Sequence, residues 1–251
     1  MKSYIFSLIS IFPCCLVTCF ILYSTLTNRH QVLKVGDKLL VIGKYDQFYD
    51  WNRIMTKYLK FPLDHHYGSH AIVLLAALYA SRTGPILELG MGTISSPLLH
   101  AVALDQKRVL VSADSDRRWI NHFSSFTLNN KLHRLKYVEV TSELGVEWAT
   151  SGIAYEENWT VVFIDHRPGP RRQYELMLYA GRSDLVILHD TEKSNLYKYN
   201  SVLESYPYRY RFTKLKTYTD VLSTRNETLV NTIRSLLESV PDYYFTNITL
   251  Q

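Results

Sequence analysis

The stretch from Gly84 to His100 reads GPILELGMGTISSPLLH and decides the fold. It begins with a turn signal, continues as a short apolar run that carries one acid, and reaches two glycines spaced G-x-G. Ser95 or Ser96 suits the N-cap of a helix, and Pro97 suits its first position, where a missing N–H costs nothing. The pattern therefore predicts a strand, a tight turn and a helix.

The turn itself is suited to a ligand. Gly90 and Gly92 permit positive φ and leave no Cβ between the backbone and a bound molecule, so a nucleoside can lie against the main chain. Ser95 stands where a dinucleotide-binding turn has its third glycine, and no Lys-Ser/Thr pair of a phosphate loop follows. The sequence therefore favours a nucleoside site over a pyrophosphate site.

Two further segments extend the nucleoside-site prediction. Residues 107–116 predict a second strand that ends in Asp114, where nucleoside-binding α/β folds place a carboxylate that accepts the ribose hydroxyls. Asp116 is expected to cap the next helix. A third strand is expected at residues 135–140, followed by Thr141, Ser142 and Glu143.

Two apolar runs end in charged residues. Residues 160–165 and 184–191 are typical of strands buried on both faces of a parallel sheet. Ligands of open α/β sheets bind outside the carboxyl ends of such strands. The two predicted strands bring four side chains to that edge, Asp165, His166, His189 and Asp190.

The order of these motifs over residues 68–224 resembles the class I, Rossmann-like S-adenosylmethionine-dependent methyltransferases, near the small-molecule, catechol-type O-methyltransferases. The resemblance implies S-adenosylmethionine as cofactor and a small-molecule methyl acceptor. It implies cofactor contacts from the turn and from the tips of the second and third strands, namely Glu88, Gly90, Gly92, Asp114 and Ser142, with Glu143 as the alternative to Ser142.

In the metal-dependent branch of that family, an Asp after the fourth strand and an Asp-Asn pair after the fifth hold magnesium. Asp165 and Asp190 match, but Thr191 replaces the Asn and the expected lysine base is missing, so no metal is predicted. Methyl transfer needs a held and deprotonated nucleophile, and either His166 or His189 beside its Asp is suited to remove the proton. The nearby arginines, Arg167, Arg171 and Arg172, are expected either to bind an anionic substrate group or to cap a helix.

Residues 4–27 carry no charge and are long enough to cross a bilayer as a helix. We expect residues 1–28 to be a transmembrane anchor or a signal sequence, residues 29–62 a connector with a helix, and residues 63–251 the methyltransferase domain. Three N-x-S/T sequons, at Asn158, Asn226 and Asn247, favour a glycoprotein with its domain in the lumen of the endoplasmic reticulum or Golgi. Basic residues after the apolar segment favour the cytosolic side instead.

The composition limits which partners and which cysteine-based sites the protein can have. The net charge of +5 over 251 residues has no dense basic run, so nucleic acid is not indicated as a partner. The three cysteines all lie in the apolar segment, which excludes a disulfide or thiolate metal site in the folded part. The fold predicted is α/β, a doubly wound and mostly parallel sheet, with an antiparallel pair at residues 208–216 and 219–224.

Two alternative functions remain at this stage. The first is a methyltransferase fold that has lost catalysis and serves as a binding or scaffolding module. The second is a nucleotide-sugar enzyme of the secretory pathway, because Asp114-Ser115-Asp116 has the Asp-x-Asp form of such enzymes' metal motif. Titration with S-adenosylmethionine would separate the scaffold from the methyltransferase, and manganese-dependent binding of a sugar nucleotide would favour the second alternative.

Overall fold

The computed structural model describes residues 32–35, 38–41, 43–128 and 130–245, with side chains from residue 50 onward. Contacts divide the chain into two units, residues 1–53 and 54–251. In the first unit, β1 (Val32–Val35) and β2 (Lys38–Val41) form an antiparallel hairpin. The helix α2 (Gly43–Tyr58) begins in the first unit and ends in the second.

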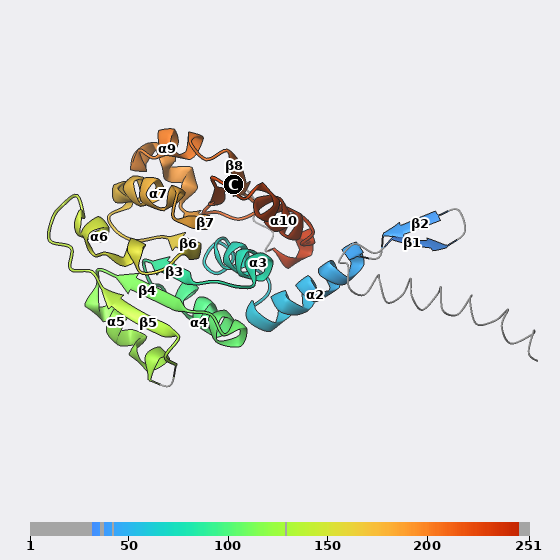
Figure 1. Ribbon diagram of the computed structural model, residues 1–251, viewed down its shortest axis with the longest axis horizontal. Helices are drawn as coiled ribbons and strands as arrows, with labels where there is room; N and C mark the ends of the chain where they lie inside the picture. Colours follow the sequence, from blue (N-terminus) through green and yellow to red (C-terminus); the bar gives the residue numbers. More distant parts are fainter. Residues whose placement is uncertain (1–31, 36–37, 42, 129, 246–251) are drawn as a thin grey trace, which may run out of the picture. The chain divides into compact units, whose positions relative to one another are not determined.

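The second unit is built on one seven-stranded sheet in the order β5-β4-β3-β6-β7-β9-β8 (Figure 1). Neighbouring strands are parallel except that β9 runs antiparallel to both β7 and β8. The strands are β3 (Ile86–Leu89), β4 (Leu110–Asp114), β5 (His133–Tyr137), β6 (Trp159–Ile164), β7 (Ser183–His189), β8 (Tyr208–Phe212) and β9 (Thr219–Ser223). This confirms the predicted α/β sheet with an antiparallel C-terminal pair.

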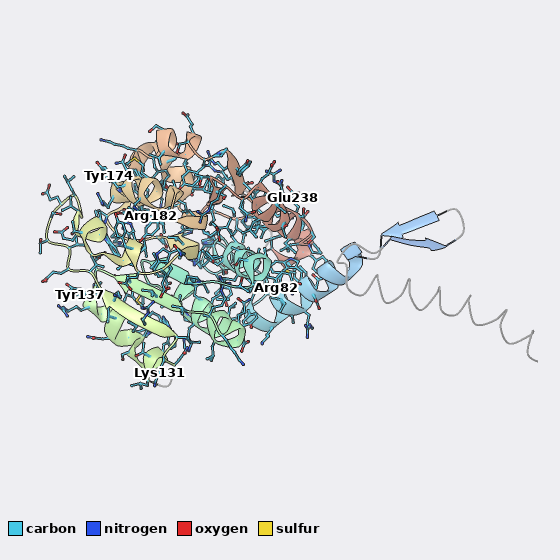
Figure 2. The ribbon with its side chains drawn as sticks, in the orientation of Figure 1. Arg82, Lys131, Tyr137, Tyr174, Arg182 and Glu238 are labelled. Atoms are coloured by element: carbon cyan, nitrogen blue, oxygen red, sulfur yellow. The ribbon has the colours of Figure 1, made fainter. Side chains whose placement is uncertain are left out.

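Helices cover both faces of the sheet (Figure 1). One face carries α3 (Ala71–Ser81), α4 (Ser95–Gln106) and α10 (Glu227–Glu238), and α3 contacts both of the others. The other carries α6 (Glu147–Thr150), α7 (Arg172–Ala180) and α9 (Asn200–Glu204), while α5 (Arg117–His122) packs on β4 and β5 and α8 (Ser194–Tyr197) follows β7. Peripheral side chains such as Lys131 and Glu238 extend outward in Figure 2.

The helix α3 is apolar on all sides, and residues 71–79 are buried. A helix with that composition needs neighbours around its whole circumference, and α3 contacts α4, α10, β6 and β7. The strand β3 alternates between the two faces: Leu87 and Leu89 join the core under α7, whereas Glu88 points toward α4. The alternation is what places one acid beneath the turn.

Two local predictions were wrong in detail. The helix α4 starts with Ile94 as its N-cap, so Ser95 and Ser96 lie inside its first turn and Pro97 is its third residue. The third strand spans His133–Tyr137, two residues earlier than predicted at its start, because its register is set by pairing with β4.

The predicted transmembrane segment at residues 4–27 lies outside the described residues. Within the part of the chain that the structure describes, no helix has both the length and the apolar character needed to cross a bilayer. Of the three sequons, Asn158 and Asn226 are described, and the Asn226 side chain accepts a hydrogen bond from Leu229 N as the N-cap of α10.

Candidate functional site

The turn after β3 lies where the order of strands reverses. The strand β3 pairs with β4 on one side and with β6 on the other, which is the topological switch point of an open α/β sheet. Gly90 has φ of +95°, and a Cβ there would lie 2.5 Å from His166 N and 2.6 Å from the carbonyl carbon of Asp165. Only glycine fits, and the turn is therefore in direct contact with the end of β6.

Gly92 has no close backbone neighbour of the kind that Gly90 has. A Cβ at Gly92 would meet only Ser95 Oγ, at an ordinary 3.5 Å. The backbone of Gly92 is thus approachable from outside, as a turn that receives a ligand requires.

Glu88 lies beneath the turn and is fully buried. Its Oε1 accepts a hydrogen bond of 2.9 Å from Ser96 Oγ, which in turn accepts one of 3.1 Å from Gly92 N. Its Oε2 has no hydrogen-bond partner among the described residues. Burial raises the pKa of Glu88 to about 7, although three serine hydroxyls oppose the shift. The structure thus connects Glu88 to the turn through Ser96.

Asp114 ends β4 and lies directly against the turn. Its Oδ2 accepts from Met91 N at 2.6 Å and its Oδ1 accepts from Asp116 N at 2.7 Å. Burial raises the pKa of Asp114, although these backbone amides oppose the rise. Asp114 thus lies where the prediction of a ribose-binding acid requires it. The next acid, Asp116, accepts a hydrogen bond from Arg118 N as the N-cap of α5, as predicted.

Ser142 does not join this group. Its hydroxyl donates to Glu147 Oε2 at 2.7 Å, and its backbone N–H donates to the other oxygen of the same carboxylate. These bonds organise the loop after β5. A contact between Ser142 and adenine therefore stays a prediction.

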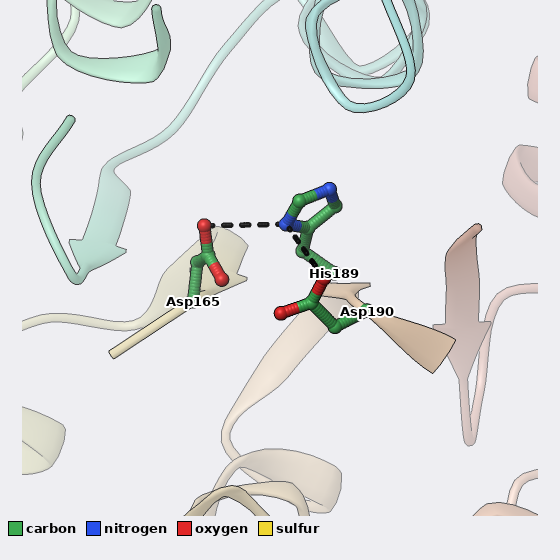
Figure 3. Close-up of side chains that lie close together, drawn as sticks. All are labelled: Asp165, His189 and Asp190. Atoms are coloured by element: carbon green, nitrogen blue, oxygen red, sulfur yellow. Dashed lines mark ion pairs between the residues drawn. The ribbon is translucent and has the colours of Figure 1, made fainter. Parts of the chain in front are cut away.

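The second group lies at the ends of β6 and β7. Figure 3 shows His189 between Asp165 and Asp190. His189 Nδ1 lies 3.3 Å from Asp165 Oδ2 and 3.8 Å from Asp190 Oδ1. Because a lone pair facing two carboxylates would be repelled, the proton of neutral His189 belongs on Nδ1. The structure thus brings together three of the four predicted catalytic residues.

The far side of His189 faces hydroxyl groups. Nε2 lies 2.6 Å from Thr217 Oγ1 and 3.4 Å from Ser69 Oγ. The His70 ring lies 4.6 Å from the His189 ring, and burial lowers the pKa of His70 to about 4. His70 is therefore neutral near pH 7, and Nε2 of His189 is the nitrogen that can accept a proton.

Arg172, the first residue of α7, joins the two strand ends. Its guanidinium donates to the backbone oxygens of Asp165 and His189 and pairs with Asp165 Oδ1 at 2.7 Å. Burial acts to raise the pKa of Asp165, but His189 and Arg172 outweigh it and hold that pKa at about 2. Asp165 is ionised throughout the physiological range.

His166 is separated from the other three. It is buried, its Nε2 lies 3.1 Å from Glu175 Oε2, and its ring stacks on Trp148 at 4.5 Å between centroids. Although His166 follows Asp165 in the sequence, its side chain faces the core under α7. His166 is therefore not a candidate for the base.

Sequence reasoning missed the hydroxyls of Ser69 and Thr217, which precede α3 and β9 and come to His189 only through the fold. The cluster of arginines in the sequence indicated a basic group near this edge. It did not indicate that Arg172 is the arginine that contacts the ends of β6 and β7. Arg171 pairs instead with Glu175, at 3.1 Å.

Metal ligation can be tested on the same residues. Asp165, His189 and Asp190 offer three ligand atoms that lie within 4.8 Å of one another. Thr191, which stands where the metal-dependent methyltransferases have Asn, donates its hydroxyl to Asp220 Oδ1 at 2.8 Å and is fully buried. The hydroxyl of Thr191 is therefore turned away from the cluster.

A separate polar hollow of about 350 Å³ is present elsewhere. Its lining residues precede β6 and β7, among them Asn158 and Arg182. It therefore lies at the amino ends of these strands, opposite to the edge that carries Gly90 and His189.

No protein-family model matches the chain, and no curated protein matches it. Solved structures do match. A candidate O-methyltransferase from Klebsiella pneumoniae is 13% identical with a TM-score of 0.47, and the match covers 82% of this chain and 96% of that one.

Human methyltransferase-like protein 13, solved in complex with SAH, is 14% identical with a TM-score of 0.46, and the match covers 72% of this chain and 96% of that one. Both TM-scores are below 0.5 and both identities are low. Function therefore has to be inferred from this chain's own residues.

Proposed function

We propose that this protein is an S-adenosylmethionine-dependent methyltransferase that acts on a hydroxyl group of a small-molecule acceptor. The observation that carries the proposal is the contact between two half-sites at one sheet edge. Gly90 belongs to the nucleoside-type turn, and it touches the backbone of Asp165, which belongs to the acid cluster. A cofactor on the turn and an acceptor over the cluster would be neighbours.

The residues of the turn fit this cofactor. Glu88 and Asp114 are buried acids whose hydrogen bonds come from hydroxyls and backbone amides, and the pKa of each is raised. A positively charged ligand would supply the missing counter-charge, and S-adenosylmethionine carries a sulfonium. When bound, this cofactor supplies an electrophilic methyl group. Gly92 would allow the nucleoside to approach the backbone, and Asp114 would accept its ribose hydroxyls.

The acid cluster supplies the base. His189 Nε2 would take the proton of the acceptor hydroxyl as its oxygen attacks the methyl carbon, with the acceptor in the place that the Thr217 hydroxyl now holds. Asp165 and Asp190 face Nδ1 and would stabilise the imidazolium that forms. Because Arg172 fixes both strand ends, the base is held in position before the acceptor binds.

Calorimetric titration tests the proposal. We expect S-adenosylmethionine and S-adenosylhomocysteine to bind the full chain, and Asp114→Asn to weaken binding about tenfold or more through the lost charged hydrogen bonds. Asp116→Asn is the matched control, since that side chain caps α5. Absence of heat with either ligand would contradict the proposal and favour the scaffold.

The nucleotide-sugar alternative receives no support from the geometry. In Asp114-Ser115-Asp116, the first acid accepts from backbone amides of the turn and the second caps α5 and pairs with Arg118. The two carboxylates serve different partners and do not form a metal-binding pair.

We further propose that residues 1–28 anchor the protein in a membrane as a single pass, with the domain in the lumen. The uncharged run at residues 4–27 and the three sequons support this. Glycosidase-sensitive mass on the expressed full chain, lost in a variant with Asn158, Asn226 and Asn247 all changed to Gln, is the expected result. Protease sensitivity of the domain in intact microsomes would contradict it.

A further inference from the structure

The acid cluster already contains its own positive charge. Arg172 pairs with Asp165 Oδ1 at 2.7 Å and with Asp190 Oδ2 at 3.4 Å, and only 5% of its side chain is exposed. Lys193 Nζ lies 3.2 Å from the other oxygen of Asp190. Two carboxylates thus face two cations, one for each negative charge.

Arg172 is also fixed in place by the backbone. Its Nε donates to the carbonyl of His166 at 2.9 Å, its Nη2 to that of Asp165 at 2.9 Å, and its Nη1 to that of His189 at 3.2 Å. A planar guanidinium held by three carbonyls cannot move aside as a flexible lysine can. The charge is therefore a permanent part of the site.

A divalent ion bound at the cluster would be repelled by the positive charge of Arg172. To bind Asp165 Oδ2, His189 Nδ1 and Asp190 Oδ1, it would have to remove the proton that Nδ1 directs at the carboxylates and displace Lys193. It would then lie next to a fixed guanidinium that already neutralises one of the two carboxylates and repels a second cation. Thr191, bonded to Asp220, offers no replacement ligand.

We infer that Arg172 is the positioning residue of this site and occupies, in charge and in function, the place that a divalent metal ion takes in the metal-dependent methyltransferases. It orients Asp165 and His189 toward the acceptor and supplies the positive charge that faces both acids. The inference rests on the proposed function for its catalytic meaning, but its charge argument does not require the cofactor.

Metal titration of the full chain tests the inference without the cofactor. We would titrate Mn²⁺ and follow the free ion by electron paramagnetic resonance, for the wild type, Arg172→Met and Arg172→Lys. The expected result is no binding at the cluster in the wild type up to about millimolar Mn²⁺. Arg172→Met should gain at least tenfold in affinity, and a second change, Asp165→Asn, should abolish the gain. Arg172→Lys, which retains the charge but can move aside, should give an affinity between those of the wild type and Arg172→Met.

Binding of Mn²⁺ by the wild type that is lost in Asp165→Asn would overturn the inference and make the cluster a metal centre. This comparison of the wild type with Asp165→Asn needs no Arg172 variant. It therefore tests the inference even if Arg172→Met does not fold. Lys193→Met, at a half-exposed position, should raise Mn²⁺ affinity less than Arg172→Met, since the guanidinium remains. Failure of the proposed function would appear separately, as absence of S-adenosylmethionine binding with the Mn²⁺ results unchanged.

Discussion

The two halves of the sheet's carboxyl edge hold their acids in opposite ways. At β3 and β4, Glu88 and Asp114 are bonded by hydroxyls and backbone amides, and the pKa of each is raised. At β6 and β7, Asp165 is bonded to Arg172 and lies beside His189, and its pKa is held at about 2.

The difference shows what each half is prepared to receive. A buried carboxyl without a cation attracts a positively charged ligand, whereas a cluster that already has its cations suits a neutral one. On the proposed function, the β3–β4 half would receive the sulfonium nucleoside and the β6–β7 half the uncharged hydroxyl. The predictions below test this division, beginning with the largest effect.

His189→Gln should separate catalysis from cofactor binding. The amide keeps a hydrogen bond in the cluster but cannot take a proton, so we expect methyl transfer to fall by about 10²- to 10⁴-fold. Single-turnover kinetics, with calorimetry for the cofactor, measure the two effects. Equal losses in transfer and in cofactor binding would show that the two halves are not separate in function.

Gly90→Ala should damage both halves at once, because a Cβ at φ of +95° would collide with the backbone of Asp165 and His166. We expect a loss of about 3 kcal/mol or more in the free energy of unfolding, measured in urea. A stability like that of the wild type would mean that the contact between the halves is loose.

Glu88→Gln should remove a pH dependence. The folded pKa of about 7 lies above the ordinary 4.5, so the native state binds more protons between these values and the wild type loses stability as pH rises from about 4.5 to 7. The loss is about 3 kcal/mol at 1.36 kcal/mol per unit. We would measure the free energy of unfolding in urea for the wild type and the variant at pH 5 and at pH 8. The difference between the two proteins should change by about this amount between the two pH values. A constant difference would mean that Glu88 is ionised when buried.

Gly92→Ala is the matched partner of Gly90→Ala. The added methyl has room in the protein, so stability should change by no more than about 1 kcal/mol. The methyl would occupy the space proposed for the nucleoside, and S-adenosylmethionine should bind about tenfold more weakly. Unchanged affinity by calorimetry would place the cofactor elsewhere.

Asp116→Ala should give the smallest effect, since it removes only the N-cap of α5. We expect a small loss of stability, measured in urea, and little change in methyl transfer. A large loss of cofactor affinity would instead assign a binding role to Asp116 and revive the Asp-x-Asp interpretation.

Local patterns in the sequence determined the elements and the positions of the acids. Apolar runs that contain an acid or end in charged residues predicted β3, β4, β6 and β7. The spacing from Gly90 to Asp114 placed that acid beside the turn. Both features depend on near neighbours along the chain.

Only the tertiary structure decided which side chains meet. His166 and His189 look alike in sequence, each beside an Asp, yet one pairs with Glu175 in the core and the other lies between two carboxylates. Arg172 turns inward, and Ser69 and Thr217 reach His189, because helices and strands that are distant in sequence pack together. The charge balance of the site depends on these long-range contacts, and no local pattern encodes them.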